Sequence, residues 1–154
     1  MAMKSGKEYI ESLRKLKPRV YVFGEKVKSV VDYPLFQPHI VAAAMTYELA
    51  KHPEFEKEMT ATSNLTGEKI NRFCHVHHSK EDLHKNQDMT RALCQIAGGC
   101  IQRCMGIDAT NAIYNVSYEA DKMNNGATEY HKNFVKWLER FQREDLGGCC
   151  AQTD

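Results

Sequence analysis

The chain has 154 residues, and its 21 basic and 20 acidic side chains leave a net charge of +1. This balance excludes the strongly charged surface that draws proteins to nucleic acid or to acidic lipid. No apolar run approaches the roughly 18 residues of a membrane span. The first residues, MAMKSGKEYIESL, lack the apolar core of a signal peptide. We therefore expect a cytoplasmic protein with no nucleic-acid or membrane partner, whose six cysteines are thiols rather than disulfides.

The N-terminal segment predicts a helix followed by a β-hairpin. Ser5 is suited to cap a helix that runs to about Leu16, and Pro18 ends that helix. Residues 19–31 then alternate apolar and polar side chains on the return arm, with Gly24 at the first central position of a tight turn. This pattern predicts a small β-hairpin within residues 19–31.

A second helix is expected to begin at Gln37-Pro38 and to run through Ala50, because proline is favoured in the first turn of a helix. Its buried face should consist of Ile40, Val41, Ala44, Met45 and Leu49. Residues 51–67 are polar and are interrupted by Pro53. Such a stretch is typical of a short helical turn within a loop.

One cysteine and three histidines follow within residues 72–78, which we expect to form a brief extended segment. Cys74, His75, His77 and His78 all have side chains that bind zinc. In an extended chain, however, His75 and His77 point to one face while Cys74 and His78 point to the other. A single site built from all of them is therefore disfavoured. We expect partly exposed or hydrogen-bonded histidines, some of them lining a pocket.

The next predicted element is a long helix over residues 80–105. Ser79 and Asp82 have the spacing of a capping box, and acidic side chains in the first turn complement the helix dipole. Gly106 suits the left-handed position that follows a helix, and Asp108 can cap the next helix. Two helices are therefore expected to meet in a tight turn at residues 106–108.

Two cysteines lie near the end of this predicted helix and one helical turn apart. The stripe they share is apolar and is expected to be buried: Leu93, Ala97, Cys100, Ile101 and Cys104. Cβ atoms at this spacing lie about 5–6 Å apart, near enough for both sulfurs to bind one metal centre but poorly placed for a disulfide. Gly98 and Gly99 indicate that another segment or a flat ligand approaches the backbone. Spacing alone leaves open the alternative that both cysteines are core residues.

The remaining chain predicts two more helices. Residues 108–123 should bury Ala112, Ile113, Val116, Ala120 and Met123. After a break at residues 124–126, a last helix over residues 128–144 carries Phe134, Trp137, Leu138 and Phe141 at core spacing. We expect residues 1–145 to form one helical domain and residues 146–154 to begin a β-domain in a polypeptide that continues further. Without that remainder, some apolar helix faces should be exposed.

Several stretches of the sequence resemble the 4-hydroxyphenylacetate 3-hydroxylase family: VYVFGEKV at residues 20–27, SKEDL at 79–83, MTRAL at 89–93 and CIQRCMGIDA at 100–109. The resemblance covers essentially the whole chain. It implies a mainly α fold, the N-terminal helical domain of an acyl-CoA-dehydrogenase-like protein that uses flavin. The last two stretches are most similar to a branch whose members convert 4-hydroxybutyryl-CoA to crotonyl-CoA by a radical mechanism. The cysteine pair selects this branch, because the hydroxylases lack it.

The resemblance further implies which residues serve the reaction. Cys100 and Cys104 would be two ligands of a [4Fe–4S] cluster, with a histidine and a further cysteine supplied from beyond residue 154. FAD would be the second cofactor, 4-hydroxybutyryl-CoA the substrate, and the full-length enzyme a homotetramer. Gln102 would face the flavin and Arg91 the substrate, although a solvated or ion-paired role is an equal alternative for each. No catalytic residue is assigned, and the chain alone is expected to be inactive.

Two other interpretations remain open at this point. The chain could form the N-terminal domain of a flavin-dependent aromatic hydroxylase of the same fold, in which the two cysteines are merely buried. Alternatively, it could be a helical interaction module left by a truncated reading frame.

Overall fold

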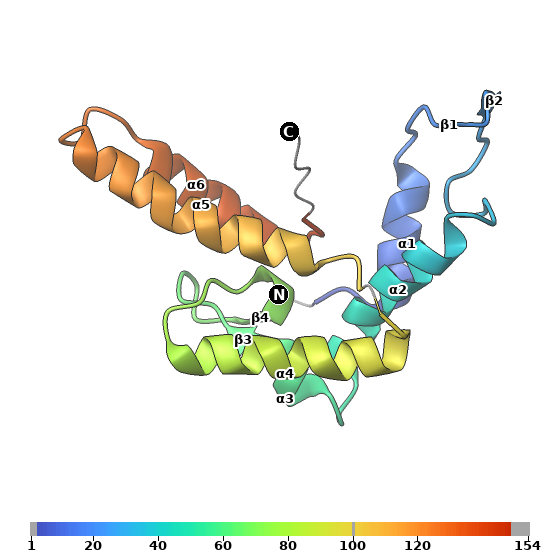
Figure 1. Ribbon diagram of the computed structural model, residues 1–154, viewed down its shortest axis with the longest axis horizontal. Helices are drawn as coiled ribbons and strands as arrows, with labels where there is room; N and C mark the ends of the chain where they lie inside the picture. Colours follow the sequence, from blue (N-terminus) through green and yellow to red (C-terminus); the bar gives the residue numbers. More distant parts are fainter. Residues whose placement is uncertain (1–2, 100, 149–154) are drawn as a thin grey trace.

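The computed structural model of the protein describes residues 3–99 and 101–148. It is mainly helical, as predicted (Figure 1). Its helices are α1 (Gly6–Lys15), α2 (Gln37–Glu48), η1 (Leu49–Lys51), α3 (Glu56–Met59), η2 (Arg72–Cys74), α4 (Lys80–Ala97), α5 (Cys104–Met123) and α6 (Tyr130–Arg143). Its strands form two small antiparallel hairpins: β1 (Tyr21–Val22) with β2 (Glu25–Lys26), and β3 (Thr60–Thr62) with β4 (Lys69–Asn71).

Three groups of helices make up the architecture. Figure 1 shows α1 and α2 side by side at one end, the α5–α6 helical hairpin at the other, and α4 running beneath both. The helix α3 packs on α4, and the η2 turn packs on α5 and α6. None of the described helices is long and apolar enough to cross a membrane.

The N-terminal helix and hairpin confirm their predictions. The Ser5 hydroxyl accepts a hydrogen bond from the Glu8 N–H at 3.2 Å, and the Glu8 carboxylate accepts one from the Ser5 N–H at 2.7 Å. This reciprocal capping box satisfies backbone donors that a helix start leaves free. In the hairpin, Phe23 (φ 50°) and Gly24 (φ 84°) form the turn between the strands. Gly24 therefore occupies the second central position rather than the predicted first, because positive φ is required at both positions.

The helix α2 begins as predicted but buries a different set of side chains. Ile40 and Ala44 are buried as expected, whereas Val41 is exposed. Tyr47 is almost fully buried because its ring stacks on that of Tyr9 from α1, with centroids 4.6 Å apart. Packing against α1 therefore makes Tyr47, and not Val41, part of the buried face of α2.

The long helix ends earlier than predicted. It stops at Ala97, where Gly98 adopts the left-handed conformation (φ 70°) and its N–H donates to the Cys94 carbonyl at 2.9 Å. Gly99 also has positive φ, at 147°. The two glycines thus terminate the helix, since positive φ costs glycine little.

The prediction that Cys100 and Cys104 lie on one helix is therefore wrong. Cys104 is the first residue of α5, while Cys100 lies outside the described residues. Gly106 and Asp108, predicted to sit between two helices, both lie inside α5. Ile101 is buried as expected, although from the loop and not from a helix.

The second β-hairpin was not predicted. Thr60 pairs with Asn71 and Thr62 with Lys69 within a stretch that reads as polar loop. The predicted extended segment is also partly wrong, because residues 72–74 form the η2 turn. The Asn71 side chain caps that turn by accepting from the Phe73 N–H at 3.1 Å. Residues 75–78 then lead into α4 without regular structure.

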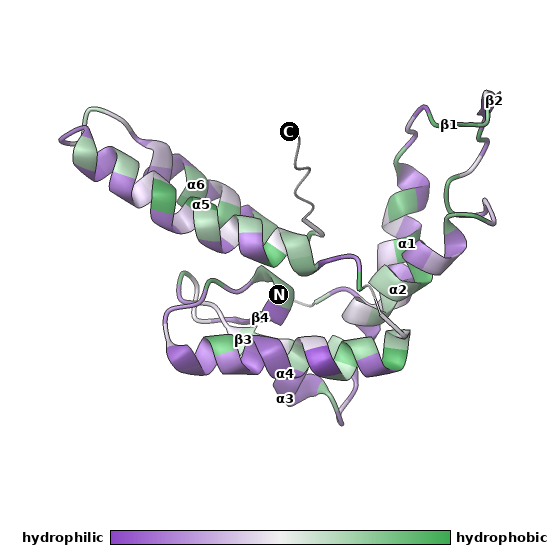
Figure 2. Cartoon of the chain, viewed as in Figure 1, coloured by the Kyte–Doolittle hydropathy of each residue, from purple (hydrophilic) through white to green (hydrophobic). Residues whose placement is uncertain are grey.

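In the helical hairpin of α5 and α6, the predicted buried face is confirmed for α6 and is wrong for α5. On α6, Leu138 and Phe141 are buried as predicted. On α5, the predicted inward residues Val116 and Met123 are 67% and 81% exposed. The residues that α5 buries are Gly106, Ile107, Thr110 and Ser117. Figure 2 shows hydrophobic residues interleaved with hydrophilic ones along both helices. On α5 some of these apolar side chains, such as Ile113 and Val116, are exposed to solvent.

Two apolar clusters form the core. One joins the inner sides of α3, α4 and the start of α5, and contains Ala50, Met59, Phe73, Met89, Leu93, Ile101 and Ile107. The other joins η2 to α6 and contains Ile70, Cys74, Val76, Leu138 and Phe141. The loop between α4 and α5 lies between these elements and leads directly to Cys104. The division into domains at residue 145 stays a prediction.

Candidate functional site

A groove lies between α1, α2 and the α4–α5 loop, and its lining includes Gln102 and Arg103, which directly precede Cys104. Its volume is about 440 Å³. It is lined by Lys4, Tyr9, Ser12, Leu13, Leu16, His39, Ile40, Ala43, Tyr47, Gln102, Arg103 and residues 146–148. Aromatic rings and a few polar groups together are typical of small-molecule sites.

Gln102 lines this groove at the turn of the loop. Its backbone has φ 63°, a conformation that non-glycine residues seldom adopt. Its side-chain nitrogen lies 3.1 Å from Nδ1 of His39 on α2. The loop therefore directs Gln102 towards α2 and into the wall of the groove.

Arg103 lies beneath the groove and is 3% exposed. Its guanidinium is sandwiched between two aromatic rings, 4.1 Å from the centroid of Tyr47 and 4.8 Å from that of Phe73. A cation held over aromatic faces is attracted by their quadrupoles, and most strongly where water is excluded. The arginine is thus anchored to α2 on one side and to η2 on the other.

Hydrogen bonds complete the anchoring of this guanidinium. Nη1 donates to the Thr46 hydroxyl at 3.2 Å. Nη2 donates to the Asp145 carboxylate at 3.3 Å and to the Leu146 carbonyl at 3.0 Å. Asp145 is itself buried. The positive charge is therefore neutralised inside the protein by a carboxylate from the segment that follows α6.

This environment also decides the state of Cys74, the buried cysteine of η2. Its sulfur lies 3.7 Å from Nη2 of Arg103. Burial raises the pKa of the Cys74 thiol to about 12, because it disfavours the thiolate more than the nearby arginine favours it. Burial likewise raises the pKa of Tyr47. Cys74 is consequently a neutral core thiol at neutral pH and a poor candidate metal ligand.

Cys104 has a different environment. It is half-buried at the first position of α5 and packs against the same apolar cluster as Cys94 and Ala97. Within the described ranges, no group of three or more histidine, cysteine or acidic side chains is arranged to hold a metal. A cluster at Cys104 would therefore need further ligands from outside those ranges.

Arg91 lies on the outer surface of α4, away from the groove. Its side chain is 70% exposed, and Nη1 lies 3.7 Å from the Asp88 carboxylate one turn earlier. Arg91 is thus ion-paired in this structure, which is the alternative to substrate binding that the sequence left open. Exposed pairs of this kind are weak, so the guanidinium remains available to an anionic ligand.

The histidines before α4 form a second polar site. Nε2 of His75 lies 3.2 Å from the Asp82 carboxylate, and His75 is buried while His78 is exposed. Burial lowers the pKa of His75 more than Asp82 raises it. Burial also acts to raise the pKa of Asp82, but hydrogen bonds from the His78 N–H and the Ser79 hydroxyl outweigh it and lower that pKa to about 2. The expectation of hydrogen-bonded histidines is confirmed for His75.

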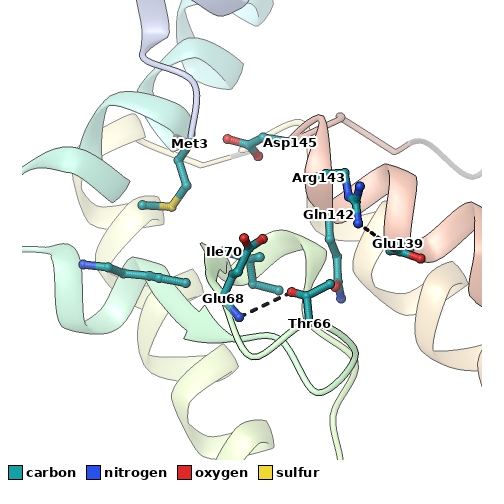
Figure 3. A pocket seen from close by; sticks show the side chains of 9 residues that line it. Met3, Thr66, Glu68, Ile70, Glu139, Gln142, Arg143 and Asp145 are labelled. Atoms are coloured by element: carbon teal, nitrogen blue, oxygen red, sulfur yellow. Dashed lines mark hydrogen bonds and ion pairs between the residues drawn. The ribbon is translucent and has the colours of Figure 1, made fainter. Parts of the chain in front are cut away.

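A small cavity also adjoins Asp145, but it cannot hold an organic ligand. Its volume is about 10 Å³, and Figure 3 shows Met3, Ile70, Gln142 and Asp145 around it. A space of this size holds about one water molecule. We therefore regard the groove beside Gln102 as the candidate site.

Arg103, Tyr47 and Asp145 were not predicted from the sequence. Arg103 enters the sequence analysis only as part of the motif CIQRCMGIDA. Its partners Thr46 and Asp145 lie 57 and 42 positions away along the chain. No local pattern brings such residues together, so only the tertiary structure could identify them.

A profile of the family described as "4-hydroxyphenylacetate 3-hydroxylase N terminal" matches residues 5–154. A curated relative, 4-hydroxybutyryl-CoA dehydratase/vinylacetyl-CoA-Delta-isomerase of Clostridium aminobutyricum, is 48% identical over 150 residues. That match covers 97% of this chain and 30% of the relative. The oxygenase component of 4-hydroxyphenylacetate 3-monooxygenase from Klebsiella oxytoca is 27% identical over 64% of this chain and 19% of its own length.

Among solved structures, too, a dehydratase is more similar to this chain than the monooxygenase component is. An oxygen-tolerant archaeal 4-hydroxybutyryl-CoA dehydratase from N. maritimus superposes with a TM-score of 0.89 at 43% identity, covering 95% of this chain and 28% of that one. The oxygenase component of 4-hydroxyphenylacetate 3-monooxygenase complexed with FAD gives a TM-score of 0.70 at 22% identity, covering 94% and 29%. The chain therefore spans less than a third of the length of these relatives.

Proposed function

The chain belongs to the 4-hydroxyphenylacetate 3-hydroxylase family, and from this premise we propose that it forms the N-terminal part of a 4-hydroxybutyryl-CoA dehydratase. Its fold is the N-terminal helical part of an acyl-CoA-dehydrogenase-like protein. The observation that carries the proposal is the 48% identity to a dehydratase over 97% of the chain. The substrate of the complete enzyme would be 4-hydroxybutyryl-CoA and its product crotonyl-CoA.

A flavin is the first cofactor that we propose for the complete enzyme. A structural relative with the same fold is complexed with FAD. The groove of about 440 Å³ offers the aromatic and polar lining that such a ligand needs, and Gln102 forms part of its wall. We assign Gln102 to flavin binding within this proposal.

An iron–sulfur cluster is the second proposed cofactor, with Cys100 and Cys104 as two of its ligands. The position of Cys104 supports this assignment, because it is half-buried at the first residue of α5 and directly follows two residues that line the groove. A [4Fe–4S] cluster supplies, when bound, an iron that can act as a Lewis acid towards the leaving hydroxyl of the substrate. The role of this chain is then to supply two of the cluster ligands.

Arg91 is proposed to bind the acyl-CoA substrate. Its exposed guanidinium is paired only weakly with Asp88, so an anionic group of the substrate can replace that carboxylate. The complete enzyme is further proposed to be a cytoplasmic homotetramer.

The aromatic hydroxylase is the alternative with some support. Its relatives match at 27% identity over about two thirds of the chain, and their structures at 22% identity establish the shared fold alone. The greater similarity to the dehydratases favours the dehydratase. Oxygen-dependent hydroxylation of a phenol by the iron-free, full-length protein would favour the hydroxylase instead.

The decisive experiment is anaerobic reconstitution of the full-length protein with iron, sulfide and FAD. We expect the wild type to convert 4-hydroxybutyryl-CoA to crotonyl-CoA. Cys100→Ala and Cys104→Ala should each lower the iron content and abolish conversion. Cys94→Ala is the matched control, because Cys94 is also half-buried and packs against the same apolar cluster as Cys104. Equal iron content and activity in all of these variants would refute ligation by Cys100 and Cys104.

A further inference from the structure

We propose that Arg103 is a positioning residue that fixes Cys104 by fastening the α4–α5 loop to the segment at residues 145–148. The inference rests on the proposed function in one respect, the assignment of Cys104 as a cluster ligand. We call this set of contacts the Arg103 latch: Arg103, Thr46, Tyr47, Phe73, Asp145 and Leu146.

The N-terminal end of the loop offers little to hold it. An added Cβ at Gly98 or at Gly99 would meet no heavy atom within 4 Å, so the described structure leaves open space beside both. Their positive φ values also permit many loop directions that other residues would resist. The conformation of the loop near Cys104 is therefore set from its other end, where Ile101 is buried in the core, Gln102 lies beside His39 and Arg103 is buried.

Arg103 supplies that fixed end. It precedes Cys104 directly, and its buried guanidinium contacts α2 through Thr46 and Tyr47. A buried charge is stable only where its partners are all in place, so it tolerates few alternative positions. Nε of Arg103 is also buried and has no partner among the described residues. A gain in stability therefore does not explain why a buried arginine occupies position 103. A requirement for one particular loop geometry does explain it.

The carboxylate of the latch is itself held in place. Asp145 has φ 44°, a strained conformation for a residue with a side chain. Its Oδ2 accepts a hydrogen bond from the Lys4 N–H at 3.1 Å, while Oδ1 accepts from Arg103. Such strain persists only where surrounding contacts enforce it, and here both ends of the carboxylate are engaged.

A second contact fastens the same region on the other side of Cys104. A Cβ added to Gly106 would lie 2.6 Å from the Gly148 carbonyl oxygen, so the first turn of α5 rests directly on that backbone. Gly106 follows Cys104 by two positions, and Arg103 precedes it by one. Cys104 is thus held between two attachments to one segment, residues 145–148.

The test uses the full-length protein with Arg103→Lys, which keeps the charge but loses the planar stack and the forked hydrogen bonds. Arg140→Lys is the matched control, because Arg140 is an exposed arginine paired with Glu144 on α6. In the metal-free protein, the alkylation rate of Cys104 by iodoacetamide is measured by mass spectrometry relative to that of Cys94. We expect about a tenfold rise for Arg103→Lys and no change for Arg140→Lys.

The same variants are then reconstituted with iron and sulfide. For Arg103→Lys we expect a lower iron content and an altered electron paramagnetic resonance spectrum of the reduced cluster, with the wild-type signal in Arg140→Lys. A folded Arg103→Lys protein with wild-type Cys104 reactivity and a wild-type cluster spectrum would overturn the proposal. A fall in thermal stability without any change in the Cys104-to-Cys94 ratio would overturn it equally.

Two further variants keep the proposal testable if Arg103→Lys does not fold. Thr46→Val removes one hydrogen-bond partner of the guanidinium at nearly constant volume, and a small rise in Cys104 reactivity is expected. Asp145→Asn keeps an acceptor oxygen but removes the counter-charge of the buried guanidinium, and a larger rise is expected. Unchanged reactivity in both would refute the latch. Failure of the proposed function is distinguishable, because a wild type that binds no iron would disprove the cluster while metal-free alkylation still decides the role of Arg103.

Discussion

The Arg103 latch and the His75–Asp82 pair are both polar contacts with buried partners, but they are assembled in opposite ways. The partners of Arg103 lie on α2, on η2 and after α6, up to 57 positions away. His75 and Asp82 lie within one short stretch. The Asp82 carboxylate also accepts hydrogen bonds from the His78 N–H at 3.0 Å and from the hydroxyl of Ser79, the N-cap of α4, at 3.0 Å. The first contact fixes how distant elements meet, whereas the second determines where one helix begins.

The difference predicts different consequences when each contact is broken. Losing a long-range buried ion pair leaves an uncompensated charge at the junction of several elements. Losing a local cap affects mainly the first turn of one helix. The changes below test this contrast, from the largest expected effect to the smallest.

Arg103→Met should have the largest effect, because it leaves the Asp145 carboxylate buried without its cation. We expect a loss of about 3–5 kcal/mol in the free energy of unfolding. Urea denaturation of the full-length protein measures the loss, and hydrogen exchange should locate it in α2 and α5. The double variant with Asp145→Asn should recover part of the loss, because the unpaired charge is gone; no recovery would show that packing alone is responsible.

Gly106→Ala should have the next largest effect. The new methyl group would lie 2.6 Å from the Gly148 carbonyl oxygen, which is backbone and cannot rotate away. Overpacking of this kind costs about 1–3 kcal/mol. Since alanine otherwise favours a helix, a thermal transition at or above that of the wild type would contradict the close approach of α5 and residues 145–148.

Asp82→Ala should cost about 1–2 kcal/mol, since it leaves the His78 N–H, the Ser79 hydroxyl and His75 without their carboxylate partner at the start of α4. Hydrogen exchange should show faster exchange in the first turn of α4 and unchanged protection in α5. Equal loosening of both helices would contradict a local role for Asp82.

The same pair predicts a dependence of stability on pH. The pKa of His75 is lowered in the folded protein, so its contribution is fully present above the unfolded value of about 6.5 and is lost as the pH falls through the lowered pKa. The pKa of Asp82 is lowered to about 2, so its contribution is present above pH 4 and lost between about pH 4 and pH 2. Replacement of His75 by glutamine should flatten the profile between pH 7 and pH 5, measured by urea denaturation at each pH.

Arg91→Ala should have the smallest effect on stability, within about 0.5 kcal/mol, because its ion pair with Asp88 is exposed. If Arg91 binds substrate, the same change should raise KM for 4-hydroxybutyryl-CoA in the full-length enzyme. Asp88→Ala is the control, since it breaks the same pair without removing the cation. An unchanged KM in Arg91→Ala would refute the proposed role.

The sequence by itself determined the local structures and the family. Ser5 and Ser79 start their helices, and Gly24 marks a hairpin, because the signals that decide these features lie within a few residues of each other. Motifs such as CIQRCMGIDA likewise pointed to the family that the comparisons establish. These features need no knowledge of distant contacts.

Only the tertiary structure decided where α4 ends, which face α5 buries and what surrounds Arg103. An apolar stripe continuous from Leu93 to Cys104 predicted one helix, but Gly98 and Gly99 end it and the loop turns Arg103 into the core. Periodicity identifies a face without saying what will cover it, so Val116 was misassigned. The positions of Thr46, Tyr47 and Asp145 around one guanidinium depend on how the elements pack, and burial makes that arrangement specific.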